Sequence, residues 1–174
     1  MLATHADAEQ RYNTLRNMAL KVTEETLQEQ DIKNIKLTTI TPAALNAAKL
    51  WEDSTTRRVN WNWLDGHSSF KFRYPKRFEI ALWQTGQLIG LSMGKPTYNG
   101  TALRLDVVEA SPTDLGDRPG IFEIVILAYG VYARLINARQ IRIMNPINEQ
   151  VKMYYETFGY TYVAKGDYLY RDIL

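Results

Sequence analysis

The chain has 174 residues, of which 45% are hydrophobic and 23% are charged, and its formal net charge is +2. This composition is typical of a soluble globular protein, and the length suits one domain better than two. The sequence has no cysteine and only two histidines, which excludes disulfides, thiolate metal sites, cysteine nucleophiles and a histidine-rich metal centre. A net charge this small does not by itself indicate a nucleic-acid partner.

No segment of the sequence has the properties of a membrane span or a secretory signal. No apolar run approaches the ~20 residues that a membrane-spanning helix needs. The first residues lack the basic flank and the apolar stretch of a signal peptide. We therefore expect a cytoplasmic protein with no membrane partner and no bound metal.

Residues 7–30 are predicted to form one long polar helix. Its apolar stripe is thin and consists of Tyr12, Leu15, Ala19, Val22, Thr26 and Leu27. Such a stripe would pack on a groove of the domain or on a second copy of the chain, so a homodimer stays open. We therefore expect a helical extension over residues 1–33 and the domain proper over residues 34–174.

The next segment is predicted to contain a strand followed by a helix. Alternation over residues 35–40 predicts the strand, and Thr41 with Pro42 predicts the start of the helix. The expected buried side of this helix consists of Ala44, Leu45, Ala48, Leu50 and Trp51. Residues 60–63 fit either a short helix or a loop that lines a pocket, and both interpretations stay open.

Residues 57–77 combine basic and aromatic side chains. The cations are Arg57, Arg58, Lys71, Arg73, Lys76 and Arg77. Five rings lie between them, and Asp65 is the one opposing charge. Such a mixture is found where phosphates are held and bases stack. The more ordinary interpretation is a strand pair with solvated cations and buried rings.

The second half of the chain predicts a mixed sheet. Residues 78–83 and 88–93 read as a hairpin, and residues 103–108 as a third strand. Residues 121–137 are apolar on most of a helical circumference, which predicts a helix deep in the fold. Residues 141–145 and a final pair of strands complete the pattern. We expect an α/β fold: a mixed, mostly antiparallel central sheet flanked by helices, with an extra N-terminal helix.

Another helix is predicted to begin near Asn148, whose side chain suits the N-cap position. Gly159 suits the left-handed position that ends a helix. The expected inward side consists of Val151, Tyr154, Tyr155 and Phe158. This stretch lies between two strand-like runs, which is typical of a compact α/β unit.

The same stretch resembles the N-x-x-A-x-x-L-Y-x-x-x-G-F signature of the GCN5-related N-acetyltransferases (GNAT). The matched positions are Asn148, Val151, Tyr154, Tyr155, Gly159 and Tyr160. Two of them are conservative substitutions, valine for alanine and tyrosine for leucine. The alternative is a capped helix that only packs against the sheet. The resemblance extends over residues ~35–174.

The resemblance implies that acetyl-CoA is the co-substrate and lies where strands 103–108 and 141–145 separate. A pyrophosphate binds best where backbone amides converge at a helix N-terminus, and residues 115–122 form such an element. The expected cofactor-binding residues are Val107, Val108, Leu115, Gly116, Arg118, Gly120, Ile121 and Asn148. The backbone of Val107 and Val108 would pair with the pantetheine amides.

This loop departs from the Q/R-x-x-G-x-G/A motif of the family. If Gly120 is the first glycine, Asp117 replaces a glutamine or arginine, and Phe122 replaces a small residue. Pro119 also removes one amide donor. Such a loop would bind CoA more weakly, or Arg118 would supply the missing positive charge.

The resemblance assigns the proton donor for the departing thiolate to Tyr155. Tyr154 is then expected to be the core aromatic. Glu109 is our candidate general base, with Asp106 and Glu79 as further carboxylates. Asn148 would either contact pantetheine or only cap its helix.

Two functions are compatible with the sequence. The first is an acetyl-CoA-dependent N-acetyltransferase that transfers an acetyl or short acyl group to an amine by direct attack. Trp61, Trp63 and Tyr168 would then line the acceptor pocket, for a small amine, a peptide N-terminus, a protein lysine or an aminoacyl-tRNA. The second is a catalytically degenerate GNAT-fold binding or regulatory module that uses residues 57–77 to bind a protein or RNA partner. Nucleic acid is thus an open but not a favoured partner.

Overall fold

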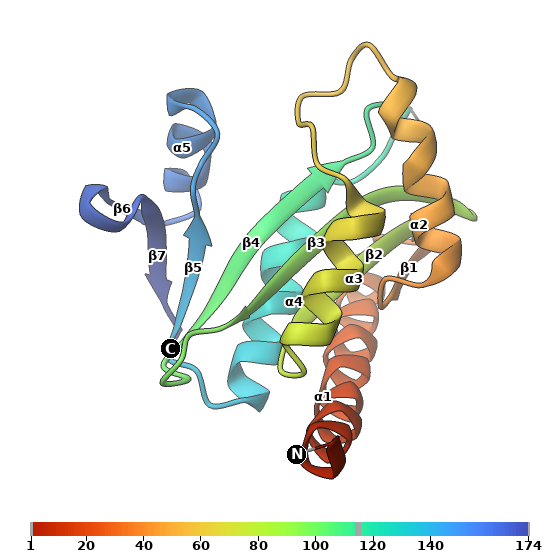
Figure 1. Ribbon diagram of the computed structural model, residues 1–174. Helices are drawn as coiled ribbons and strands as arrows, with labels where there is room; N and C mark the ends of the chain where they lie inside the picture. Colours follow the sequence, from red (N-terminus) through yellow and green to blue (C-terminus); the bar gives the residue numbers. More distant parts are fainter. Residues whose placement is uncertain (1, 114–115, 174) are drawn as a thin grey trace.

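A seven-stranded sheet organises the chain in the computed structural model, which describes residues 2–113 and 116–173 (Figure 1). The strands are β1 (Ile35–Thr38), β2 (Phe78–Gln84), β3 (Gln87–Pro96), β4 (Ala102–Ala110), β5 (Gln140–Met144), β6 (Thr161–Val163) and β7 (Tyr168–Asp172). Their spatial order is β1-β2-β3-β4-β5-β7-β6. Neighbouring strands are antiparallel except β4 and β5, which are parallel. The predicted mixed, mostly antiparallel sheet is confirmed.

Helices cover both faces of the sheet. They are α1 (Leu2–Glu29), α2 (Pro42–Lys49), α3 (Trp63–Arg73), α4 (Ile121–Leu135) and α5 (Glu149–Glu156), with 3-10 turns at Leu50–Asp53 and Ala164–Gly166. Helices α1, α4 and α5 share one hydrophobic core with the sheet, and α2 and α3 share a second core on the opposite face. Within residues 2–113 and 116–173, no helix combines the length and the apolarity that a membrane crossing requires.

Helix α1 packs against α4 and the sheet, so the expected docking of the N-terminal helix is found. Its buried face differs from the predicted stripe and consists of Arg16, Ala19, Leu20, Thr23 and Leu27. Val22, which we expected to face inward, is exposed. The apolar pattern predicted the wrong face of α1, because the buried face contains a polar threonine and a charged arginine. The Thr23 hydroxyl donates to the Ala19 carbonyl, and Nη1 of Arg16 donates to the Pro75 carbonyl, whereas the buried Nε of Arg16 has no hydrogen-bond partner within the described residues.

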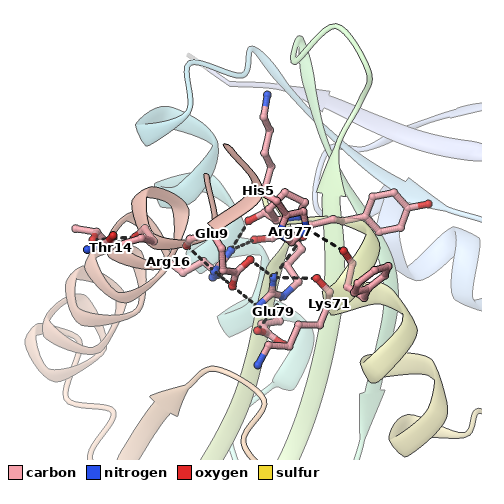
Figure 2. Close-up of polar contacts among 12 residues, drawn as sticks. His5, Glu9, Thr14, Arg16, Lys71, Arg77 and Glu79 are labelled. Carbon is pink, nitrogen blue, oxygen red and sulfur yellow. Dashed lines mark hydrogen bonds and ion pairs between the residues drawn. The ribbon is translucent and has the colours of Figure 1, made fainter. Parts of the chain in front are cut away.

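A buried network of charges joins α1 to the sheet (Figure 2). Arg77 lies between Glu9 of α1 and Glu79 of β2, with donor–acceptor distances of 2.8 Å and 3.1 Å. Arg16 donates to Glu9 and to the backbone carbonyl of Pro75. His67 of α3 bonds to the second oxygen of Glu79. Helix α1, helix α3 and strand β2 are therefore held together by polar side chains that are buried, except that Glu9 is partly exposed.

The basic and aromatic segment is a loop followed by helix α3, and not a strand pair. Asn62 caps the helix by accepting from the Asp65 amide at 3.1 Å. Trp63 and His67 form its buried side. The preceding helix is shorter than expected, because α2 ends at Lys49 and continues as a 3-10 turn. As a result Leu50, which we expected to be buried, is exposed.

Strands β3 and β4 form a hairpin with an irregular register. Gly94 pairs with Leu105 and Met93 pairs with Val107, so Asp106 is an extra residue in β4. A bulge of this kind bends the strand and increases its twist. A Cβ atom at Gly94 would lie 1.8 Å from the Arg104 carbonyl oxygen, so only glycine allows this close approach. The bulge immediately precedes the candidate site.

Candidate active site

The parallel strands β4 and β5 separate halfway along their length. Their register runs from Ala102 and Gln140 to Leu105 and Ile143 and then stops. Strand β4 stays paired with β3 as far as Ala110. Strand β5, in contrast, ends at Met144, and the chain turns away at Asn145 (φ 49°). Figure 1 shows the two strands diverging toward the end of the sheet at which α5 lies. The expected separation of the two strands is therefore found.

A cavity of about 460 Å³ fills this separation. One wall is the far half of β4, residues 105–110, and the opposite wall is the end of β5 with residues 143–147. The starts of α4 and α5 contribute further lining residues: Ile121, Phe122, Val151, Tyr154 and Tyr155. The loop before α3 closes the other side with residues 56–59 and Trp61. The cavity is therefore lined by elements from both faces of the sheet, and we call it the β4–β5 slot.

The backbone of β4 is available inside the slot. Val107 and Val108 pair with β3 on one side, and no described strand pairs with them on the side facing β5. An extended ligand with amide groups could add to this edge as a further strand. Both residues line the slot, in agreement with the sequence prediction of where they lie.

Tyr155 is a buried side chain that lines the slot. Its ring stacks on Phe122 with centroids 4.4 Å apart. Within the described residues its hydroxyl makes no hydrogen bond. Burial, with a smaller contribution from Tyr154, raises the pKa of Tyr155 to about 12. The phenol is therefore protonated at neutral pH and can donate a proton or a hydrogen bond.

Tyr154 is the exposed member of the pair, contrary to our expectation that it would be the core aromatic. Its hydroxyl donates to Glu123 at 3.2 Å. Both tyrosines lie on the apolar side of a regular helix, so spacing alone does not distinguish them. Tyr155 is the buried one of the two because its ring stacks on Phe122. The bulky residue of the divergent loop thus orients the predicted proton donor.

The N-terminus of α4 faces the slot. Gly120 is its N-cap residue and has no side chain to satisfy the first amides. Gly116 adopts a positive φ of 72°, and Ile121 lines the slot. Arg118 also lines the slot and donates to the Ser111 carbonyl at 2.6 Å. Leu115 lies outside the described residues.

A carboxylate of the chain occupies part of this helix N-terminus. A Cβ atom at Gly120 would lie 1.9 Å from Oε2 of Glu123, so this side chain folds back over the helix start. A negative charge is favourable there, because the helix dipole is positive at its N-terminus. Glu123 therefore stands where the position of the loop would place a phosphate. Sequence analysis missed it, although a glutamate three residues after an N-cap is a known signal.

Glu109 is buried at the edge of the slot, and both of its carboxylate oxygens accept hydrogen bonds. Arg57 donates to both of its oxygens, at 2.8 Å and 3.2 Å, and the Trp63 indole donates at 2.6 Å. These bonds fix the loop before α3 to β4. Arg57 was missed as a partner because the two residues are 52 positions apart.

Asp106 is the other carboxylate in the slot. Arg104 donates to its Oδ1 at 2.6 Å, whereas Oδ2 is buried and has no hydrogen-bond partner within the described residues. The bulge places this side chain between the slot and the face covered by α3, because Asp106 lines a cavity on each side. The buried Oδ2 keeps the capacity to accept one further hydrogen bond, for example from an ammonium group that reaches it.

The predicted acceptor residues are only partly assembled. Trp61 lines the slot and meets Trp63 edge to face, with centroids 6.2 Å apart. Trp63 lies behind it and bonds to Glu109. Tyr168 does not line the slot; the Arg142 guanidinium lies over its ring, 4.8 Å from the ring centroid.

Asn148 caps α5 by accepting from the Val151 amide at 2.8 Å and does not line the slot. In the described residues there is no group of three or more metal-ligating side chains.

Comparison with solved structures identifies the fold. No protein-family model matches the sequence, and no curated protein does. A structure described as a GNAT-family acetyltransferase from Desulfovibrio desulfuricans is similar at a TM-score of 0.63 and 11% identity, over 80% of this chain and 99% of that one. The ribosomal-protein-S18-alanine N-acetyltransferase of Escherichia coli matches at 0.58 and 12%, over 80% and 94%. An aminoglycoside 6′-N-acetyltransferase complexed with coenzyme A matches at 0.59 and 13%, over 79% and 97%.

The chain therefore has the fold of the GCN5-related N-acetyltransferases. At 11–13% identity the likeness establishes this architecture, and the chemistry has to be argued from the slot itself.

Proposed function

We propose that the protein is an acetyl-CoA-dependent N-acetyltransferase that transfers an acetyl or short acyl group to an amine by direct attack. The observation that carries this proposal is the separation of β4 and β5 beyond Leu105 and Ile143, which opens a slot lined by the neutral hydroxyl of Tyr155. The fold neighbours support acyl transfer to amines as the general class of reaction.

The residues of the slot fit the parts of an acyl-CoA. The free edge of β4 at Val107 and Val108 suits the amides of the pantetheine arm. The start of α4, with Arg118, Gly120 and Ile121, suits the diphosphate. The Glu123 carboxylate has to move aside or be neutralised for this fit. The side chain is exposed and Tyr154 is its one described hydrogen-bond partner, so such a movement is inexpensive.

Two side chains of the protein carry out the two proton transfers of this reaction. In the reaction, the amine nitrogen bonds to the carbonyl carbon and the carbon–sulfur bond breaks. Tyr155 donates its proton to the departing thiolate and recovers one from solvent. Asp106 accepts a proton from the incoming ammonium through its unpaired Oδ2, directly or through water. We assign this role to Asp106 in preference to Glu109, because Arg57 and Trp63 already occupy both oxygens of Glu109.

The acceptor would enter from the side of Trp61. The fold neighbours act on chemically different amines, since their names include an alanine of a ribosomal protein, an aminoglycoside and spermidine. For this chain the ring of Trp61 and the carboxylate of Asp106 favour an amine beside an apolar or ring-bearing portion. Trp63 would support Trp61 from behind and would not contact the acceptor.

Release of free thiol from acetyl-CoA, measured across a panel of amines, tests the proposal. We expect at least one amine to raise thiol release well above hydrolysis, and Tyr155→Phe to lower kcat by about 100-fold, since acid–base groups contribute roughly 10²- to 10⁴-fold. Tyr154→Phe is the matched control and should retain the wild-type kcat at saturating acetyl-CoA, because its hydroxyl bonds to Glu123 and has no role in the proton transfer. If Tyr155→Phe retained the full rate with an amine that the wild type accepts, the assigned role of Tyr155 would be wrong.

One observation favours a second candidate, a GNAT-fold binding module without turnover. Glu123 at the α4 N-terminus and Asp117 in the preceding loop both disfavour a diphosphate. In the segment 57–77, Arg57 and Arg77 form internal ion pairs, which leaves Arg58, Lys71, Arg73 and Lys76 for a partner. Absence of any acetyl-CoA binding, together with salt-sensitive binding to RNA or to an acidic protein, would favour this candidate.

A further inference from the structure

A second concave surface lies at the end of the sheet opposite the wide end of the slot. It is formed where the β3–β4 hairpin meets the end of α3 and the side of α1, and it encloses about 610 Å³. Its described lining contains four cations, Arg73, Lys76, Lys95 and Arg104, and no carboxylate. The whole chain has 21 basic and 19 acidic residues, so this local excess is not a consequence of composition. We call this surface the cationic groove.

Most of these charges are not neutralised. Arg104 pairs with Asp106, but Arg73, Lys76 and Lys95 have no carboxylate partner within the described residues. Two of them lie over rings instead. The Lys95 ammonium is 3.4 Å from the centroid of Tyr74, and the Lys76 ammonium is 5.7 Å from that of Tyr12. Such contacts orient a cation without removing its charge, so the groove keeps a positive potential.

An exposed aromatic ring stands beside these cations. Tyr98 is at the tip of the β3–β4 hairpin and is fully exposed, and its ring has no partner within the described residues. It lines the groove on one side of the hairpin and a smaller hollow with Arg142 on the other. A free ring flanked by cations is the arrangement on which bases stack while phosphates are held.

A further hollow lies between the groove and the slot. This hollow shares Arg73, Tyr74, Lys95 and Arg104 with the groove, and shares Asp106 with the slot. Positive charge therefore extends along one face of β4 up to the carboxylate at the bulge. A linear anionic ligand fits this path better than a single small anion does.

We propose that the cationic groove binds single-stranded nucleic acid, with phosphates on Arg73, Lys76 and Lys95 and a base stacked on Tyr98. An acidic peptide would satisfy the cations but would leave the Tyr98 ring unused, so the ring favours a nucleotide strand. This binding goes beyond the proposed acyl transfer and does not require it. A strand that continued along the hollow would approach the slot at Asp106.

Fluorescence anisotropy of labelled single-stranded RNA and DNA of ~12 nucleotides, titrated at several salt concentrations without acetyl-CoA, tests this proposal. Each phosphate contact contributes about 0.7 to the slope of log K against log salt for a single strand, so three contacts predict a slope of about −2. Lys76→Gln with Lys95→Gln should weaken binding and reduce that slope to roughly −0.7. Lys49→Gln with Lys165→Gln removes the same charge from exposed positions outside the groove and should change little.

The ring is tested separately from the charges. Tyr98→Ala should weaken binding about tenfold, whereas Tyr98→Phe, which keeps the stacking surface, should bind like the wild type. Because Tyr98 is fully exposed, neither change should alter the unfolding transition. Three results would overturn the proposal: no strand binding, equal weakening by both pairs of lysine substitutions, or displacement of the strand by poly-glutamate at equal charge concentration. Acetyl-CoA is absent throughout, so this test and the transfer assay succeed or fail separately.

Discussion

Glu123 is expected to oppose cofactor binding in the proposed site. Its carboxylate lies against the backbone of Gly120, at the N-terminus of α4, and Tyr154 holds it there. A diphosphate arriving at the same helix start would meet this negative charge. Glu123 thus stabilises helix α4 in the ligand-free protein and weakens the binding of a diphosphate at the same place.

Glu123→Gln should therefore tighten the binding of acetyl-CoA. Removing the charge should lower Kd roughly 2- to 5-fold, in line with the ~0.3–1 kcal/mol typical of a charge at a helix terminus. Glu156→Gln, on the exposed end of α5, removes the same charge elsewhere and should leave Kd unchanged. Isothermal calorimetry measures both, and weaker binding by Glu123→Gln would show that this carboxylate helps to hold the cofactor.

Asn148 can be assigned to one of its two expected roles by substitution. Its side chain caps α5, and it does not line the slot. Asn148→Asp keeps a capping oxygen, whereas Asn148→Ala removes it and should cost about 1 kcal/mol of unfolding free energy. If capping is its whole role, Asn148→Asp should retain the wild-type Kd for acetyl-CoA in calorimetry. A large loss of affinity in Asn148→Asp with unchanged stability would instead assign Asn148 to the cofactor.

At the scale of elements, the long first helix is fixed by buried charge as much as by apolar contact. Burial alone would raise the pKa of Glu79, but the His67 hydrogen bond and the Arg77 charge outweigh it, and the pKa is lowered. In Glu9 the Arg77 hydrogen bond and charge likewise outweigh burial and lower the pKa. Both carboxylates are therefore bound more favourably as anions in the folded state than in the unfolded chain.

The sign of the pH effect follows from these lowered pKa values. The contribution of Glu79 and Glu9 to stability is fully present above their unfolded pKa of about 4.3 and is lost as the pH falls through the folded values. We expect urea unfolding of the wild type to lose stability steeply below about pH 5, and Glu79→Gln to show a shallower loss. Parallel pH profiles for the two proteins would contradict this account of the network.

The same network should be sensitive to the loss of one member at neutral pH. Glu79→Gln removes one of the two carboxylates that pair with the buried Arg77 and should lower the unfolding free energy by ~1–3 kcal/mol. Asp31→Asn breaks the exposed pair with Lys33 and should change it by less than ~0.5 kcal/mol. Chemical denaturation distinguishes the two, and a Glu79→Gln protein as stable as Asp31→Asn would refute the structural role.

Element positions were largely predictable from the sequence, because turns and caps are local signals. The hairpin between β2 and β3 follows from Thr85 and Gly86, which both adopt positive φ, and α5 follows from its asparagine cap. Helix α3 was not predictable, because its inward side is Trp63 and His67 among exposed aromatic residues such as Phe72. The buried face of α1 was also hidden, since Arg16 lies in it.

At the scale of the whole molecule, the position of the slot could be predicted from the sequence, but the side-chain pairs around it could not. The resemblance to the acetyltransferase signature implied that β4 and β5 are parallel and separate, so the position of Val107, Val108 and Tyr155 could be predicted from it. The pairs that fill the site join distant segments, such as Arg57 with Glu109 and Tyr154 with Glu123. Spacing does not encode such pairs. Trp63 is held behind Trp61 by its hydrogen bond to Glu109, and Arg57 donates to the backbone carbonyl of Trp61 beside the slot.

Calorimetric titration of acetyl-CoA into the wild type and into a protein with a filled slot tests the central claim most directly. Val151→Trp places a large ring on the α5 wall of the slot, whereas Met153→Trp adds the same ring to an exposed position on the same helix. We predict that the wild type and Met153→Trp bind acetyl-CoA at one site, and that Val151→Trp loses at least tenfold in affinity while remaining folded. Equal binding by all three proteins, or no binding by the wild type, would contradict the claim that the opening between β4 and β5 holds the thioester.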